Sequence, residues 1–189
     1  MRIVVCVKHV PDMQSERRFE GGRLVRGEDD VLNELDENAI EAAVQLKEAE
    51  EDAGREAEVV ALTMGPEDAE DALMRALQMG ADRAYIVSDE FLEGSDVITT
   101  ASVLSVAIAK IADECGPVDL VITGMASLDA MTSMLPGALA AKAHMPLLGL
   151  ARSMSVEDGT VTIERSVDGF TETLRAALPA VVSVTDQIN

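Results

Sequence analysis

Strands that alternate with helices constrain the fold of this chain more than any other feature of its sequence. Runs of β-forming residues occupy 2–10, 57–65, 83–88 and 118–123. Because they are apolar along most of their length, they are typical of strands covered on both faces, as in a parallel sheet. Segments with helical periodicity follow at 33–54, where Asp36 is the expected cap, and at 66–80, 95–114 and 132–143. This alternation predicts an α/β fold, with a mostly parallel sheet and helices on both faces.

The pattern changes after Leu147. Apolar and polar residues then alternate with a period of two, and "EDG" (157–159) and "VDG" (167–169) are typical hairpin turns. We therefore expect a C-terminal part that is rich in β-hairpins. Another hairpin turn is expected at 20–24, in "EGGRL". No linker or internal repeat divides the chain, so residues 1–189 are expected to form a single domain.

The composition argues against several classes of function. The net charge is −20, which disfavours nucleic acid as a partner because phosphate binding requires clustered Lys and Arg. No apolar run approaches the ~20 residues of a membrane-spanning helix, so membrane insertion is not expected. Cys6 and Cys115 lie in apolar contexts without CxxC spacing. They are interpreted as reduced thiols of a cytoplasmic protein.

The segment "VDLVITGMASLDAMTS" (118–133) is the strongest local indication of a binding site. Its strand ends at Gly124, which permits close approach of another backbone or a ligand. Ligands of open α/β sheets bind at the carboxyl ends of strands, next to a switch in strand order. Asp129 suits the cap of the following helix, or a ligand for ribose hydroxyls or amide donors. Three further residues offer hydroxyl groups near that helix start: Ser127, Thr132 and Ser133.

The residues alone leave a nucleotide pocket and a plain structural turn as alternatives. Neither GxGxxG nor GxxxxGK[ST] occurs, so a standard dinucleotide fold and a P-loop nucleotidase are not indicated. His9 and His144 lack a nucleophile pattern and metal-ligand spacing, so we expect no catalytic residue and no metal. His144 is interpreted as a cation at a helix end and His9 as a structural side chain. Lys8, at the end of the first strand, is suited to neutralise an anion.

Six longer segments carry a resemblance to a known family. They are "IVVCVKHVPD" (3–12), "LNELDENAIEAAVQLKE" (32–48), "ALTMGPEDAEDALMRALQMGADRAYIVSD" (61–89), "GSDVITTASVLS" (94–105), "DLVITGMASLD" (119–129) and "LPAVVSVTDQIN" (178–189). Together they resemble the β subunit of electron transfer flavoproteins, including its FixA branch. The resemblance runs along the whole chain.

The resemblance implies an adenine-nucleotide-binding, HUP-like fold and a heterodimer with an α subunit that holds most of an FAD. Such proteins carry electrons from flavin-dependent dehydrogenases, for example those of acyl-CoA, to a quinone reductase or another acceptor. The β subunit is implied to be an electron carrier rather than an enzyme. It holds AMP, or a second FAD in bifurcating members. Family members usually continue past the position of Asn189 with a C-terminal extension that wraps the α subunit, so we expect this domain to lack that extension.

The same resemblance assigns a nucleotide pocket. The implied residues are Cys6, Lys8, Asn33, Glu34, Leu35, Asp36, Met64, Asp96, Thr99, Thr100, Gly124, Ser127, Asp129, Thr132 and Ser133. Two other functions remain open. One is an electron-transfer subunit of an acyl-CoA reductase or bifurcating complex, and the other is a stand-alone adenine-nucleotide-binding module.

Overall fold

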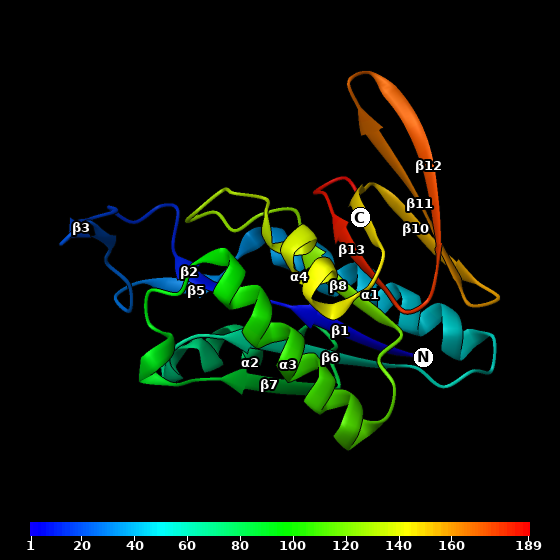
Figure 1. Cartoon of the computed structure of the whole chain (residues 1–189), viewed down its shortest axis with the longest axis horizontal. Coiled ribbons are helices and arrows are strands. Elements are labelled where there is room, and N and C mark those ends of the chain that lie inside the picture. Colours follow the sequence, from blue (N-terminus) through cyan, green and yellow to red (C-terminus); the bar gives the residue numbers. More distant parts are fainter.

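The computed structural model describes residues 1–189 and has a parallel β-sheet at its centre (Figure 1). Its six strands lie in the order β7-β6-β1-β8-β13-β9, and every pairing is parallel. The side chains of the central strands are almost all buried, as expected for a sheet covered on both faces. The expected parallel sheet is confirmed. Its strands are β1 (Arg2–Cys6), β6 (Glu58–Met64), β7 (Arg83–Val87), β8 (Leu120–Gly124), β9 (Leu147–Ala151) and β13 (Ala180–Val184).

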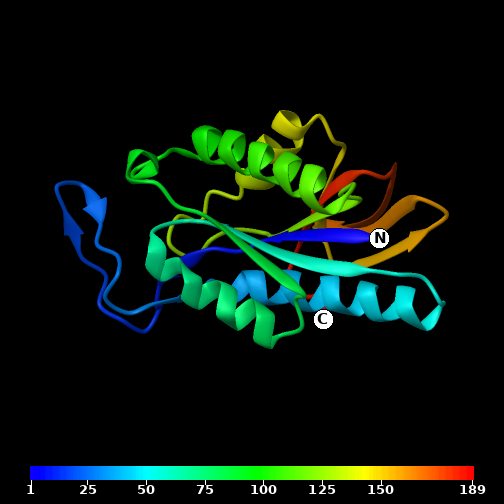
Figure 2. The same cartoon turned by 90° about the horizontal axis from the view of Figure 1, so that it is seen from below.

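Helices cover both faces of this sheet, as Figure 2 shows. One face packs against α1 (Glu34–Asp52) and α2 (Glu70–Gln78), and the other against α3 (Val97–Cys115) and α4 (Leu135–Ala143). The core on each face is almost entirely aliphatic. Short 3₁₀ turns, η1 (Glu67–Ala69) and η2 (Glu90–Leu92), precede α2 and α3. None of the four α-helices combines the length and the hydropathy that crossing a bilayer requires.

A second sheet of three antiparallel strands confirms the predicted C-terminal hairpins. It consists of β10 (Ser153–Glu157), β11 (Thr160–Val167) and β12 (Phe170–Ala177). Both turns lie at Asp-Gly pairs, 158–159 and 168–169, whose residues all have positive φ, as two-residue hairpin loops require. Val161 and Ile163 pack against the main core, and the tip of the β11–β12 hairpin extends beyond the body of the molecule (Figure 1).

Residues 12–29, here called the arm, leave the main sheet after its first strand. At the base of the arm, β2 (His9–Pro11) pairs with β5 (Asp30–Leu32). Within the arm, β3 (Phe19–Glu20) and β4 (Arg23–Leu24) form a short hairpin. This hairpin confirms the turn predicted at 20–24.

The strand predicted over 2–10 is interrupted after Cys6. The backbone N–H of Lys8 donates to the Asp36 carboxylate at 2.9 Å, and the Lys8 carbonyl accepts from the Asn33 N–H at 2.9 Å. Because both backbone groups of Lys8 bind the beginning of α1, the chain leaves the parallel sheet there. The apolar pattern alone could not reveal this long-range competition for hydrogen bonds.

Helix starts also differ from the predictions, among them those of α1 and α4. The first helix begins at Glu34, so Asp36 lies inside its first turn and is not its cap. The helix predicted from residue 132 begins at Leu135. Met131 and Ser133 have φ values of 50° and 53°, in the left-handed region that an α-helix excludes.

Candidate functional site

The strand order reverses between β1 and β8. From β1 the sheet continues through β6 and β7 on one side, and through β8, β13 and β9 on the other. Ligands of open α/β sheets bind outside the carboxyl ends of strands at such a position. Lys8 follows β1 there, and the loop at 124–134 follows β8. The structure therefore brings together the two elements that the sequence analysis singled out.

Asp36 connects these two strand ends. Its carboxylate accepts the Lys8 N–H at 2.9 Å. Burial raises the pKa of Asp36 from 3.8 to about 7, and hydrogen bonds with Asn33, Lys8 and Gly124 offset part of the rise. A Cβ atom on Gly124 would lie 2.6 Å from Asp36 Oδ1 and 2.7 Å from the Leu35 carbonyl oxygen. Glycine at 124 thus allows the β8 end to approach α1.

Asn33 attaches the loop after β8 to the beginning of α1. The residue is fully buried, its Nδ2 donates to the Ala126 carbonyl at 3.0 Å, and its Oδ1 accepts from the Leu128 N–H at 3.0 Å. One side chain thereby satisfies two backbone groups of the loop. Asn33 and Asp36, which the resemblance assigns to a nucleotide, use these polar atoms to position the loop.

Asp129 is held by two cations and does not cap a helix. Lys8 Nζ lies 2.8 and 3.1 Å from its two carboxylate oxygens, and Arg26 from the arm also donates to it. The Asp129 side chain is fully buried, whereas those of Lys8 and Arg26 are 40% and 38% exposed. Burial alone would raise the pKa of Asp129, but the hydrogen bonds from Arg26 and Lys8 outweigh it and hold the pKa below its usual range. The predicted cap role is therefore wrong, because α4 begins only at Leu135.

The other residues assigned by resemblance lie in several environments. Cys6 belongs to the core beneath α3 and α4, and burial together with the Asp36 charge raises the pKa of its thiol to about 12. Asp96 caps α3 by accepting the Thr99 N–H at 2.7 Å, so this helix begins at Val97, two residues after the predicted start. The remaining residues of this set differ in exposure. Half-buried are Leu35, Met64, Thr100 and Ser127, and exposed are Glu34, Thr132 and Ser133.

Two arginines at this site were not predicted from the sequence. Arg26 pairs with Asp129, and Arg17 Nη1 donates to the Leu128 carbonyl at 3.2 Å. Both belong to the arm, about a hundred residues from the loop that they contact. The only available signal was that Arg17 and Arg26 are cations in an otherwise acidic chain. That signal does not identify a contact.

The two histidines also differ in environment. His144 caps the C-terminus of α4 with left-handed backbone, which confirms its predicted position at a helix end. His9 is buried on β2, and neither of its ring nitrogens has a hydrogen-bond partner in the protein. Neither residue contributes to the cluster around Asp129.

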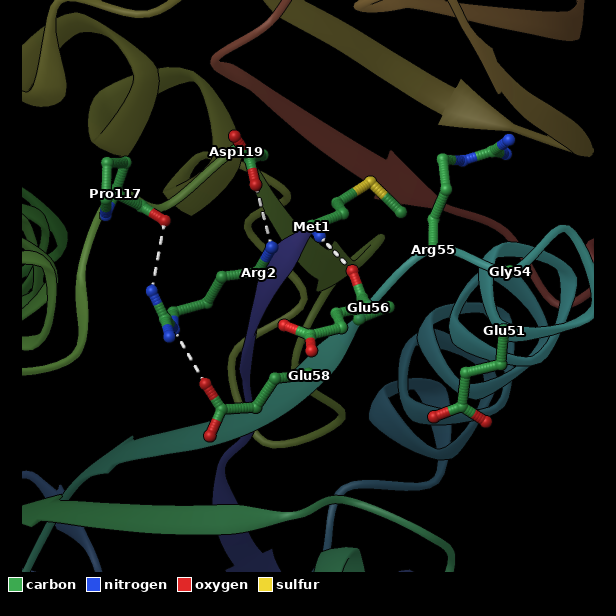
Figure 3. Close-up of a pocket in the computed structure, with 10 residues that line it drawn as sticks. Met1, Arg2, Glu51, Gly54, Arg55, Glu56, Glu58, Pro117 and Asp119 are labelled. Carbon is green, nitrogen blue, oxygen red and sulfur yellow. Dashed lines mark hydrogen bonds and ion pairs between the residues drawn. The ribbon is translucent and has the colours of Figure 1, made fainter.

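A hollow of about 680 Å³ lies at the opposite edge of the sheet. Figure 3 shows Arg2 there, between Glu58 and Asp119. These residues begin or precede parallel strands, whereas ligands of such sheets bind beyond the strands' carboxyl ends. The hollow is open and polar, and the Arg2 guanidinium is already paired with Glu58. The reversal point, rather than this hollow, is the candidate site.

Comparisons with known proteins show to which family the chain is similar. A family model described as "Electron transfer flavoprotein domain" matches residues 22–189. The electron transfer flavoprotein subunit beta of Mycobacterium leprae is 42% identical over 99% of this chain and 70% of its own length. Protein FixA of Sinorhizobium fredii is 33% identical, over 100% of this chain and 66% of its own length.

A third relative is the caffeyl-CoA reductase-Etf complex subunit CarD of Acetobacterium woodii. It is 33% identical over 100% of this chain and 70% of its own length. The family match covers most of the chain, and the relatives align along nearly all of it. The chain therefore belongs to the electron transfer flavoprotein family, alongside its β subunits and FixA proteins.

Proposed function

We propose that this chain is an electron-carrier subunit that binds an adenine nucleotide at the reversal point between β1 and β8. The observation that carries the proposal is the loop at 124–134, held over the end of β1 by Asn33 and Asp36, with Lys8 beside it. A half-exposed lysine at a strand end suits the phosphate of AMP. The nucleotide would have a structural role.

The redox group would come from a partner. We propose a heterodimer with an α subunit that holds most of an FAD, accepts electrons from a flavin-dependent dehydrogenase and passes them to a quinone reductase or another acceptor. The similarity to β subunits along the chain supports this assignment. Residues 1–189 would form a single domain within that complex.

A second candidate function rests on the CarD relative, whose name places it in a reductase complex. In this alternative, the chain is the electron-transfer subunit of an acyl-CoA reductase complex, and the β1–β8 site binds FAD instead of AMP. The adenosine and phosphate groups are common to the two ligands. The ligand group that contacts Lys8 would therefore differ little between the two functions.

The identity of the bound molecule tests both candidates. The purified chain is denatured, and the supernatant is analysed by mass spectrometry. AMP supports the carrier subunit with a structural nucleotide, and stoichiometric FAD supports the reductase-type subunit. If no nucleotide is released, calorimetric titration with AMP and with FAD follows. Failure to bind either would contradict the proposed site.

A further inference from the structure

The arm makes contacts with two loops at the carboxyl edge of the sheet. Arg17 and Arg26 reach the loop after β8, at Leu128 and Asp129. Arg23 reaches the loop after β7, where it pairs with Glu93 at 2.8 Å. The arm therefore lies across the edge at which the proposed nucleotide binds. Its position depends on side chains that carry positive charge.

The cluster around Asp129 holds more positive than negative charge. Lys8 and Arg26 share this single carboxylate, so one positive charge of the three groups is not compensated within the cluster. The carboxylate is buried, whereas both cations remain more than one third exposed. Arg26 uses only part of its five N–H donors on Asp129. Lys8 and Arg26 can therefore donate to a further acceptor without losing Asp129.

We propose that Arg26 is the second cation of the anion site and, with Lys8, binds a phosphoryl group of the nucleotide; this inference rests on the nucleotide site proposed above. A guanidinium presents two parallel N–H groups that match phosphate oxygens. Asp129 lies between the two cations and fixes their separation. Because Arg26 belongs to the arm, the same contact fastens the arm over the bound nucleotide.

The chemistry that this pair recognises is a phosphoryl group next to adenosine. AMP supplies it as a phosphate monoester, and FAD supplies it as a pyrophosphate. Adenosine has the same base and ribose but no phosphate. Comparing the three ligands therefore separates a contact with the phosphoryl group from any general effect on the pocket.

Calorimetric titration of the full chain with AMP, FAD and adenosine tests the assignment. The variants are Arg26→Gln, which removes the charge, and Arg26→Lys, which keeps it without the planar fork. The matched control is Arg23→Gln, which removes a cation of the same arm that pairs with Glu93 instead. We expect Arg26→Gln to weaken the affinity for AMP or FAD by about tenfold and to leave the affinity for adenosine within about twofold of the wild-type value.

The control Arg23→Gln should keep the wild-type preference for phosphorylated ligands over adenosine. Arg26→Lys should keep part of the preference that Arg26→Gln loses. An effect of Arg26→Gln on AMP assigns the contact to a monoester, and an effect on FAD assigns it to a pyrophosphate. If the wild type binds phosphorylated ligands and Arg26→Gln keeps the full preference for them, the inference is overturned. If the wild-type chain binds none of the three ligands, the proposed nucleotide site itself fails.

Discussion

Asp36 and Gly124 are in such close contact that any side chain at 124 would overlap the Asp36 carboxylate. A Cβ atom there would come within 2.6 Å of Asp36 Oδ1. This contact fixes the beginning of α1 against the end of β8, and so determines where the loop at 124–134 starts. The geometry of the candidate site thus depends on one glycine and one buried acid.

Gly124→Ala should destabilise the protein by about 1–3 kcal/mol, because the added methyl group must push α1 away from β8. The measurement is urea-induced unfolding monitored by circular dichroism. Gly137→Ala is the matched control: Gly137 lies in α4, and its added Cβ would come no closer than 3.9 Å to Leu147. We expect this control to be neutral or stabilising by up to about 1 kcal/mol. Equal stabilities of the two variants would show that the protein accommodates a methyl group at 124 without having to move α1 away from β8.

Asp36→Asn should change how stability depends on pH. Because burial raises the pKa of Asp36 from 3.8 to about 7, its contribution is fully present below the unfolded pKa and is lost as the pH rises through the folded pKa. At 1.36 kcal/mol for each pH unit, the wild type should lose about 3 kcal/mol relative to Asp36→Asn between about pH 5 and about pH 8. Urea unfolding of both proteins at both pH values gives this difference.

A suitable control for that experiment is Glu34→Gln, which removes an exposed carboxyl group from the same helical turn. The hydrogen-bonding cost of the asparagine is similar at both pH values and cancels in the comparison. A stability difference between wild type and Asp36→Asn that stays constant with pH would contradict the raised pKa.

Asn33→Ala should cost about 2–4 kcal/mol, because it leaves the Ala126 carbonyl and the Leu128 N–H without a partner in a buried setting. Hydrogen exchange should show faster exchange of the Leu128 amide and its neighbours. Asn38→Ala serves as the comparison, since the Asn38 side chain donates only to the exposed Asn189. If both variants exchange alike at residues 125–130, Asn33 does not hold the loop.

The sequence predicted the parallel sheet because strands such as β6 and β8 are apolar along most of their length, and this signal is local. It predicted the hairpins because Asp-Gly pairs restrict their own backbone. It could not place the end of β1, since Asp36 and Asn33 compete for the backbone of Lys8 from far along the chain. It also could not find Arg26. The arm has little regular structure, and no periodic pattern links it to Asp129.

Asp129→Asn provides a test with the opposite dependence on pH from Asp36. The pKa of Asp129 is held below its usual range by Arg26 and Lys8, against the effect of burial. Its stabilising contribution is therefore present above the unfolded pKa, near 4, and is lost as the pH falls through the folded value.

We expect Asp129→Asn to be about 2 kcal/mol less stable than wild type at neutral pH, because two cations lose their shared partner. The deficit should shrink as the pH falls below about 4, because the unfolded wild-type chain then binds a proton at Asp129 that the folded protein does not yet bind. Unfolding titrations from neutral to acidic pH measure it, and equal stability at neutral pH would mean that Asp129 is free to serve a ligand rather than to hold Lys8 and Arg26.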